Sequence, residues 1–210
     1  WPGSPASATR PEYFISSDYD AFPVVNIDWR NADAYCRWRG SALPTEAQWE
    51  MAARVAPQTG AATVYPWGDE WNPDLLNACD ASCPLDNRNT SNDDGWPQTA
   101  PVDAFEGGAS PIGALNMAGN VAEWTSTAFD ESVYDFDHDL NPEYSYDAIA
   151  SDPPSLKRKV IRGGSWKDIG YYMHTGTRSY ENQDTTKAYI GLRSVMTYLG
   201  RGKAVNAEDL

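Results

Sequence analysis

The sequence predicts an α+β fold that is rich in loops and has little regular secondary structure. Composition is the first reason, because the 210 residues include 16 Gly, 15 Pro, 9 Trp and 12 Tyr, a mixture typical of irregular chains pinned by aromatic side chains. The second reason is that only two stretches, ending near Arg39 and Arg54, carry clear helix signals, and the apolar runs are short. A hydrophobic content of 41% still provides a core for one large domain.

Charge narrows the classes of partner. A formal net charge of −14 argues against nucleic acid as a partner, and it suits divalent cations or basic proteins.

No apolar run approaches the roughly 18 residues of a membrane span. We expect a processed or incomplete piece of a longer protein, because the chain opens on Trp1 with no initiator Met or signal peptide.

Three regions are expected along the chain. Residues 1–21 read as an extended leader, residues 22–200 as the folded domain, and residues 201–210 as a polar tail. Apolar runs predict three strands within the domain, at Phe22–Trp29, Lys159–Trp166 and Tyr189–Met196. The second of these runs enters a Gly-Gly turn.

Two helices are predicted from start and stop signals. Asp28 or Asn31 can cap the first helix, and Gly40 stops it. In the second helix, Thr45 and Gln48 stand at the Ncap and N3 positions of a capping box. The buried faces should be formed by Ala32, Tyr35 and Cys36 in the first helix, and by Trp49, Ala52 and Ala53 in the second.

The three cysteines leave at least one thiol unpaired. Cys79 and Cys83 are four residues apart, and they form either a small local disulfide or none. A structural zinc site is not expected, because no second sulfur pair and no histidines lie nearby. We expect Cys36 to be a buried, unreactive thiol on the inner face of the first helix.

The stretch Gly113–Trp124, GALNMAGNVAEW, combines oxygen donors with buried anchors. Asn116 and Glu123 offer hard oxygen atoms, and Gly119 permits a turn that a side chain would crowd. Oxygen donors on an ordered loop suit calcium, although a polar turn between strands explains the same residues. The segment Asp86–Gly95 resembles a calcium loop in composition only, and we expect a hydrophilic loop there.

Residues Asp130–Asp152 form an acidic block with interleaved aromatic residues and no Lys or Arg, and a short basic run follows. Opposite charges in adjacent blocks suit a docking surface, since complementary patches steer association. The alternative is a solvated insertion whose aromatic rings cover the domain's own flank. The predicted interface residues are Tyr134, Phe136, Tyr144, Lys157 and Arg158.

Catalytic arrangements are weakly indicated by the residues themselves. The two histidines are His138, inside the acidic block, and His174. Asp168 or Arg178 is a candidate partner for His174, but no serine or cysteine nucleophile adjoins it by motif. On these residues alone, no catalytic group is assigned.

Seven motifs occur in a fixed order: PVVNIDWRNADAYCRWRG, LPTEAQWEMAAR, YPWG, APVDAF, NMAGNVAEW, RGGSW and IGLR. In this order they closely resemble the formylglycine-generating-enzyme-like (sulfatase-modifying factor) family, over about Phe22 to Met196. The resemblance implies a C-type-lectin-related fold with little regular secondary structure.

The resemblance also implies two calcium sites at matching positions of this chain. The first would use the side chains of Asn77 and Asp94 with the carbonyl groups of Ala78 and Trp96. The second would use the side chains of Asn116 and Glu123 with the carbonyl groups of Gly119 and Val121.

The chain departs from the family at the cysteines. Formylglycine-generating enzymes carry a copper-binding cysteine pair between the RGGS motif and the closing strand, whereas Gly163–Arg193 contains no cysteine. In some relatives a cysteine at the position of Ser194 is the partner of the cysteine that matches Cys36. Cys36 therefore lacks this family partner here. Copper is therefore not expected, because the thiolates that hold Cu(I) are missing, although Met173 and His174 offer other ligand atoms.

The second half, roughly Asn120–Gly200, resembles one branch of the family, the gliding-motility lipoprotein K group of the type IX secretion machinery. That branch implies a non-enzymatic subunit of a self-associating periplasmic ring, which binds a ring partner called protein N. It also implies attachment to the outer membrane through a lipid anchor that this chain lacks. We therefore expect a structural ring subunit and no catalytic residues.

Two alternatives remain open. One is a formylglycine-generating or related oxidase-type enzyme with an altered active site. The other is a lectin-like module that binds a ligand through its loops, since one fold hosts many functions.

Overall fold

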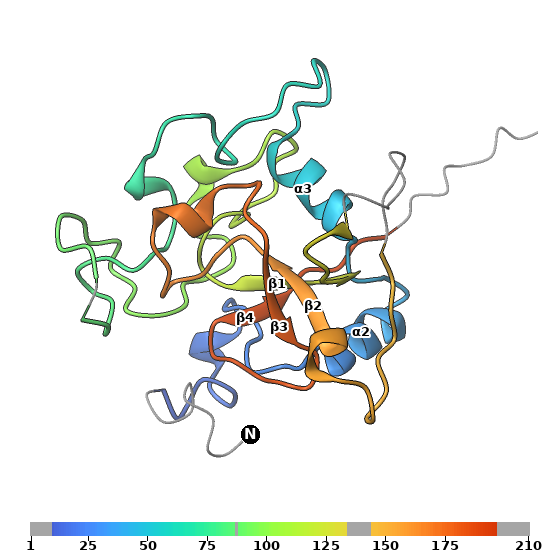
Figure 1. Cartoon of the computed structure of the whole chain (residues 1–210). Helices are drawn as coiled ribbons and strands as arrows, with labels where there is room; N and C mark the ends of the chain where they lie inside the picture. The colour runs from blue at the N-terminus through green and yellow to red at the C-terminus, as the bar shows by residue number, and fades with distance from the viewer. Residues whose placement is uncertain (1–9, 87, 134–143, 197–210) are drawn as a thin grey trace, which may run out of the picture.

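A small sheet lies at the centre of the molecule and loops surround it (Figure 1). The computed structural model describes residues 10–86, 88–133 and 144–196. The sheet has four strands in the order β3-β2-β1-β4. Their bounds are Ala122–Ala128 for β1, Arg158–Arg162 for β2, Ser179–Asn182 for β3 and Ile190–Leu192 for β4.

Strand pairing places the end of the chain beside its middle. Strand β1 pairs antiparallel with β2, and β2 pairs antiparallel with β3. Strand β4 lies parallel to β1, with Glu123 opposite Gly191. The loop that follows β2 therefore starts from this small sheet, and its residues line both cavities of the candidate site described below.

The two predicted helices are confirmed as α2 (Trp29–Trp38) and α3 (Glu46–Arg54). Asp28, not Asn31, caps α2, because its side chain accepts from the Asn31 N–H group at 2.8 Å. Thr45 and Gln48 form the predicted capping box of α3. Within the described residues there are also short 3-10 helices, at Ser17–Tyr19, Pro73–Leu75, Glu106–Gly108, Pro154–Lys157 and Gly170–Met173.

Two predictions about these elements are wrong. Residues 22–28 form no strand; Asn26 takes a left-handed conformation with φ of 57°, and Trp29 is already the first residue of α2. Tyr35 is 43% exposed, so the buried face of α2 consists of Trp29, Ala32 and Cys36. Both errors have the same cause: an apolar side chain alone indicates neither a strand nor a buried position, because both depend on tertiary contacts that the local sequence does not show.

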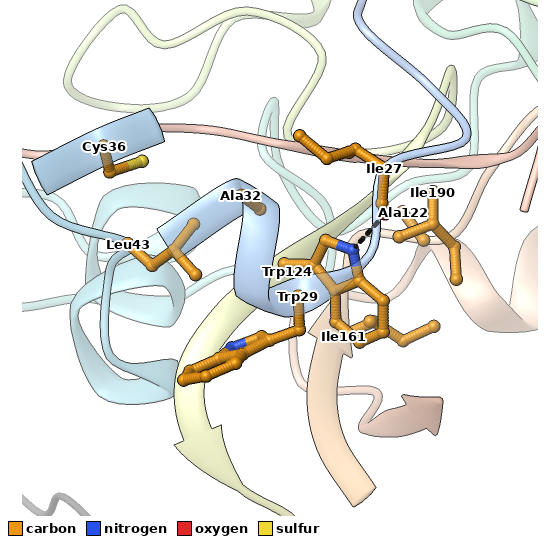
Figure 2. Packing of buried hydrophobic residues seen from close by; sticks show 9 residues of the cluster. All are labelled: Ile27, Trp29, Ala32, Cys36, Leu43, Ala122, Trp124, Ile161 and Ile190. Carbon is orange, nitrogen blue, oxygen red and sulfur yellow. Dashed lines mark hydrogen bonds between the residues drawn. The ribbon is translucent and has the colours of Figure 1, made fainter. Parts of the chain in front are cut away.

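Two buried indoles join α2 to the sheet (Figure 2). The Trp124 ring is fully buried, and its N–H donates to the Ile27 carbonyl oxygen at 3.0 Å. The Trp29 N–H donates to the Thr125 carbonyl oxygen at 2.7 Å. Aromatic rings satisfied in this way supply most of the area that a small core buries. The rest of this cluster is Ala32, Cys36, Leu43, Ala122, Ile161 and Ile190.

The described part of the predicted leader packs onto the domain. Tyr13 is buried against Val25 and Val121, and its hydroxyl donates to the Pro23 carbonyl oxygen at 2.6 Å. Arg10 donates to the Thr99 hydroxyl at 2.9 Å. Residues 10–21 thus fold into turns against the domain. In the described ranges, no helix is long and apolar enough to cross a membrane.

Lys159 is a buried cation on β2, and its burial predicts how the stability of the protein depends on pH. Its ammonium lies 3.8 Å from the centre of the Trp29 ring and donates to the Tyr146 carbonyl oxygen at 2.8 Å. Burial lowers the pKa of Lys159 from 10.5 to about 8, and Asp147 offsets only part of this effect. The unfolded chain keeps this proton up to a higher pH than the folded chain does.

We therefore expect the free energy of unfolding to rise with pH between about 8 and 10.5, where the unfolded state binds more protons. The Lys159→Met variant should lack this rise, because it has no group to titrate there. Urea unfolding of both proteins across this range checks the prediction. Parallel pH profiles for the two proteins would contradict it.

Candidate functional site

The turn at Gly163 and Gly164 follows β2 and brings several loops together. Both glycines have positive φ, 95° and 67°. A Cβ atom on Gly164 would lie 2.8 Å from the Tyr172 carbonyl oxygen, so the backbones approach too closely for a side chain. The Gly119 N–H donates to the Gly163 carbonyl oxygen at 2.9 Å, which ties this turn to the loop before β1.

Arg162, just before the turn, holds a neighbouring loop from inside the protein. Its side chain is fully buried, and its guanidinium lies 2.5 Å from a Glu50 oxygen and 3.3 Å from a Glu46 oxygen. The same group donates to the carbonyl oxygens of Thr175 at 2.7 Å and Thr177 at 2.8 Å. The planar fork of arginine thus fixes the chain directly after His174.

A cavity of about 220 Å³ is lined mainly by the segment that follows this turn. The Lys167 ammonium lies 2.5 Å from an Asp168 oxygen and 4.3 Å from the centre of the Tyr189 ring. The other Asp168 oxygen accepts from the Ser165 hydroxyl at 2.7 Å. Glu181 also faces this cavity. A fixed cation beside carboxylates and tyrosines can orient a polar substrate and accept or donate protons.

A larger cavity of about 480 Å³ lies on the other side of Asp168, which lines both. Its walls include Tyr65, whose hydroxyl lies 3.0 Å from Nε2 of His174. Burial raises the pKa of Tyr65. His174 therefore pairs with Tyr65, which was not among the candidate partners Asp168 and Arg178, and the sequence separation of 109 residues hid this pairing.

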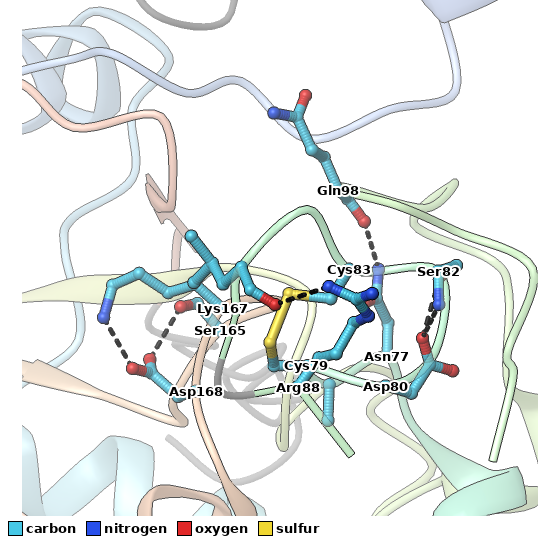
Figure 3. The surroundings of a disulfide bond; sticks show 12 residues. Asn77, Cys79, Asp80, Ser82, Cys83, Arg88, Gln98, Ser165, Lys167 and Asp168 are labelled. Carbon is cyan, nitrogen blue, oxygen red and sulfur yellow. Dashed lines mark hydrogen bonds and ion pairs between the residues drawn. A yellow bond between two sulfur atoms is a disulfide. The ribbon is translucent and has the colours of Figure 1, made fainter. Parts of the chain in front are cut away.

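Cys79 and Cys83 form a disulfide at the edge of the larger cavity, with their Cα atoms 5.1 Å apart (Figure 3). Trp166 of the RGGSW motif packs against both sulfur-bearing residues. Cys36 is a free, buried thiol whose pKa is raised by burial, as predicted for the inner face of α2. No cysteine of this chain is therefore a free thiol lining either cavity.

The first predicted calcium set contains a buried oxygen that lacks a partner. Oδ1 of Asn77 makes no hydrogen bond, while its amide nitrogen donates to the Gln98 carbonyl oxygen at 2.7 Å. The Asp94 carboxylate accepts from the backbone N–H groups of Trp96 at 2.7 Å and Ala78 at 3.3 Å. Burial raises the pKa of Asp94 to about 7, so its negative charge lacks compensation. These residues fit a cation that prefers oxygen ligands.

The second predicted set fits less completely. Oδ1 of Asn116 is also buried without a partner, and its amide nitrogen donates to the Val102 carbonyl oxygen at 2.8 Å. Glu123, however, already accepts from the Trp49 indole N–H at 2.7 Å and from Arg193 at 2.9 and 3.0 Å. Its carboxylate retains only part of its capacity to accept bonds from donors or ions. Within the described ranges, no three His, Cys, Asp or Glu side chains are grouped to hold a metal, so any site must use amides and carbonyls.

Removing calcium should therefore lower the melting temperature. An ion present at 100 times its dissociation constant stabilises by about 2.7 kcal/mol, which is several degrees for a domain of this size. In the Asn77→Ala variant, the part of this fall in melting temperature that comes from the first calcium set should be absent. Thermal unfolding with and without a chelator measures the effect, and an unchanged wild-type melting temperature would contradict calcium binding.

The described residues of the predicted interface make contacts within the chain. The Lys157 ammonium donates to the Ala150 carbonyl oxygen at 2.8 Å, and the Arg158 guanidinium lies 4.3 Å from the centre of the Tyr180 ring. Tyr144 and Arg158 line a cavity of about 300 Å³. Tyr134 and Phe136 lie outside the described residues. A docking role for this region stays a prediction.

The chain matches the model of the sulfatase-modifying factor enzyme 1-like domain over residues 3–198. It is 34% identical over 210 residues to the formylglycine-generating enzyme of Mycobacterium tuberculosis, covering 93% of this chain and 65% of the relative. It is 31% identical to the inactive C-alpha-formylglycine-generating enzyme 2 of Bos taurus, covering 82% of this chain and 49% of that protein. The chain thus spans about half to two thirds of these relatives.

Among solved structures, PvdO from Pseudomonas aeruginosa has the same fold, with a TM-score of 0.59 at 21% identity over 82% of this chain and 60% of that one. The expectation of a non-enzymatic protein is contradicted, because relatives at 34% identity are named as enzymes, although others are named inactive. The predicted loop-rich α+β fold is confirmed. The chain belongs to the formylglycine-generating-enzyme-like, or sulfatase-modifying factor, family.

Proposed function

We propose that the chain is an oxidase-type enzyme of this family with an altered active site, located in the cavity of about 220 Å³ after the Gly163–Gly164 turn. One observation carries the proposal. All residues lining this cavity except Ala122 and Ile161 come from Gly163–Arg193, the segment that in formylglycine-generating enzymes holds the cysteine pair. The cavity thus lies at the segment where the resemblance places the family's cysteine pair, and this segment of the chain contains no cysteine.

A thiolate-held copper centre does not fit these residues. Cys36 is buried in α2, and the sulfur atoms of Cys79 and Cys83 are bonded to each other. The groups that face the cavity are the ammonium of Lys167 and the carboxylates of Asp168 and Glu181. Thiolates are the ligands that Cu(I) prefers, and this cavity offers none.

Lys167 and Asp168 are the residues proposed to act on the substrate. An ammonium has three N–H donors, and one of them serves Asp168, so Lys167 can also hold a carbonyl or an anionic group of a peptide. Asp168, held by Ser165, can accept a proton from a group placed there. The substrate class is a peptide that contains cysteine, as the relatives' name implies a formylglycine product.

Oxygen uptake with a cysteine-containing peptide tests this function, with calcium and copper salts supplied in separate assays. We expect peptide-dependent uptake by the wild type and a loss of roughly tenfold or more in Lys167→Met, since fixed donors at a reacting centre contribute at least this much. Lys157→Met, which changes a lysine outside this cavity, should retain the rate. Uptake that is absent in the wild type, or equal in both variants, would overturn the proposal.

The expected role as a structural ring subunit rests only on the resemblance of the second half of the chain to the gliding-motility lipoprotein K group. The family model and the relatives described above name no secretion machinery, ring partner or membrane attachment. A role in assembly stays a prediction beside the enzymatic proposal.

A further inference from the structure

The larger cavity has an aromatic wall. Tyr65 stacks on Trp67 with ring centres 5.2 Å apart, and it contacts Trp71 with centres 5.5 Å apart. Trp71 covers Gly170, where an added Cβ atom would lie 3.4 Å from the indole ring. Tyr171 lines the same cavity and remains largely exposed. Two of these three lining rings, Trp71 and Tyr171, are therefore accessible to an entering ligand.

Carboxylates supply the charge of the same cavity. Asp80, Asp94 and Asp168 line it, and no Lys or Arg does. Asp168 is paired with Lys167, but among the described residues neither Asp80 nor Asp94 forms an ion pair. Asp80 is only 4% exposed, and its oxygens accept from Ser82 and from the Asp94 backbone N–H. A buried carboxylate without a cation is costly unless a ligand supplies one.

Aromatic faces and carboxylates that lack a cationic partner recognise the same kind of ligand. A cation is attracted to the face of an indole or phenol ring by about 0.5–2 kcal/mol, and an ionised carboxylate adds a charge-assisted bond. A cavity of about 480 Å³ also has room for a flat apolar group next to the cation.

We propose that this cavity binds a small organic cation, an amidinium or guanidinium attached to a flat apolar group, between the rings of Trp71 and Tyr171 and the carboxylate of Asp80. The site is separate from the proposed catalytic cavity, although Asp168 lines both. It adjoins the first predicted calcium set, because Asp94 lines this cavity and its backbone N–H donates to the Asp80 carboxylate. Asp80 is not a member of that set, so its carboxylate is the one that we assign to the organic cation.

Benzamidine and benzamide form the test pair, since they have the same shape and differ in charge. Calorimetric titration of the whole chain, in saturating calcium, should show that benzamidinium binds at least tenfold more tightly than benzamide. Raising the salt concentration should weaken the binding of the cation more than that of the neutral probe. Equal affinities, or displacement of benzamidinium by calcium, would overturn the proposal.

Substitutions locate the site. Trp71→Ala should weaken benzamidinium binding roughly tenfold, and Asp80→Asn should weaken it while sparing benzamide. Trp38→Ala removes an exposed ring on α2 away from the cavity, and it should leave the affinity unchanged. Lys167→Met should bind benzamidinium at least as tightly as the wild type, because it removes a cation beside Asp168, which lines this cavity. Full benzamidinium binding by a folded Trp71→Ala variant would show that the ligand lies elsewhere.

Discussion

Replacing Arg162 by alanine should lower the free energy of unfolding by about 3–5 kcal/mol, because it breaks a buried ion pair from one side. The change would leave the carboxylates of Glu46 and Glu50 without this partner, and the carbonyl groups of Thr175 and Thr177 without donors. Arg178 still pairs with Glu46, so part of the network would survive. The expected loss follows from desolvated groups left unpaired and not from the charge alone.

Arg37→Ala is the matched control. Arg37 also forms an ion pair with a carboxylate, with 2.8 Å between its Nε and an Asp33 oxygen, but its side chain is 74% exposed. Removing an exposed helix pair of this kind costs about 0.5 kcal/mol. Urea unfolding of the two variants measures the contrast. Similar losses for Arg37→Ala and Arg162→Ala would mean that the buried network contributes no more than a surface pair does.

Local signals in the sequence predicted the helices, because caps act over three or four residues. The Thr45–Gln48 capping box is present as expected. The strand expected at Phe22–Trp29 fails for the opposite reason. Its apolar residues are buried by distant partners, since Val25 packs with Tyr13 and Val121, and no strand of the described residues pairs with it. An apolar run indicates burial, whereas a strand also needs a partner that the local sequence does not show.

The candidate sites could be predicted only where a motif carried them. Asn116 and Glu123 were already candidates from the Gly113–Trp124 stretch, whereas the full calcium sets came from the family resemblance. The buried, unpartnered oxygens of Asn77 and Asn116 agree with such a use. The pairing of Tyr65 with His174 joins residues 109 apart, and the Arg162–Glu50 pair joins residues 112 apart. Such contacts depend on how the loops close over the sheet, so neither spacing nor composition indicates them.

Replacing Gly119 by alanine should cost about 3 kcal/mol or more, as the sum of an unfavourable backbone and an overpacked contact. Gly119 has φ of 78°, and a Cβ atom there would lie 2.2 Å from the Asn77 carbonyl oxygen. That oxygen accepts from the Asn120 N–H at 2.9 Å, and the Gly119 N–H itself reaches Gly163. The added methyl group would therefore push apart the segments that carry both predicted calcium sets and the turn beside the proposed active site.

Gly113→Ala separates the two contributions to this cost. Gly113 has nearly the same backbone conformation, with φ of 82°, but a Cβ atom there would meet nothing within 4 Å. Its variant should lose only the roughly 1–2 kcal/mol that a left-handed conformation costs an alanine. Calcium should partly restore the stability of Gly113→Ala, whose ligands stay in place, and should restore Gly119→Ala less, because its Asn77 is displaced. Equal losses in the two variants would mean that the loops at Asn77 and Gly119 separate freely, and that their close contact does not hold the site together.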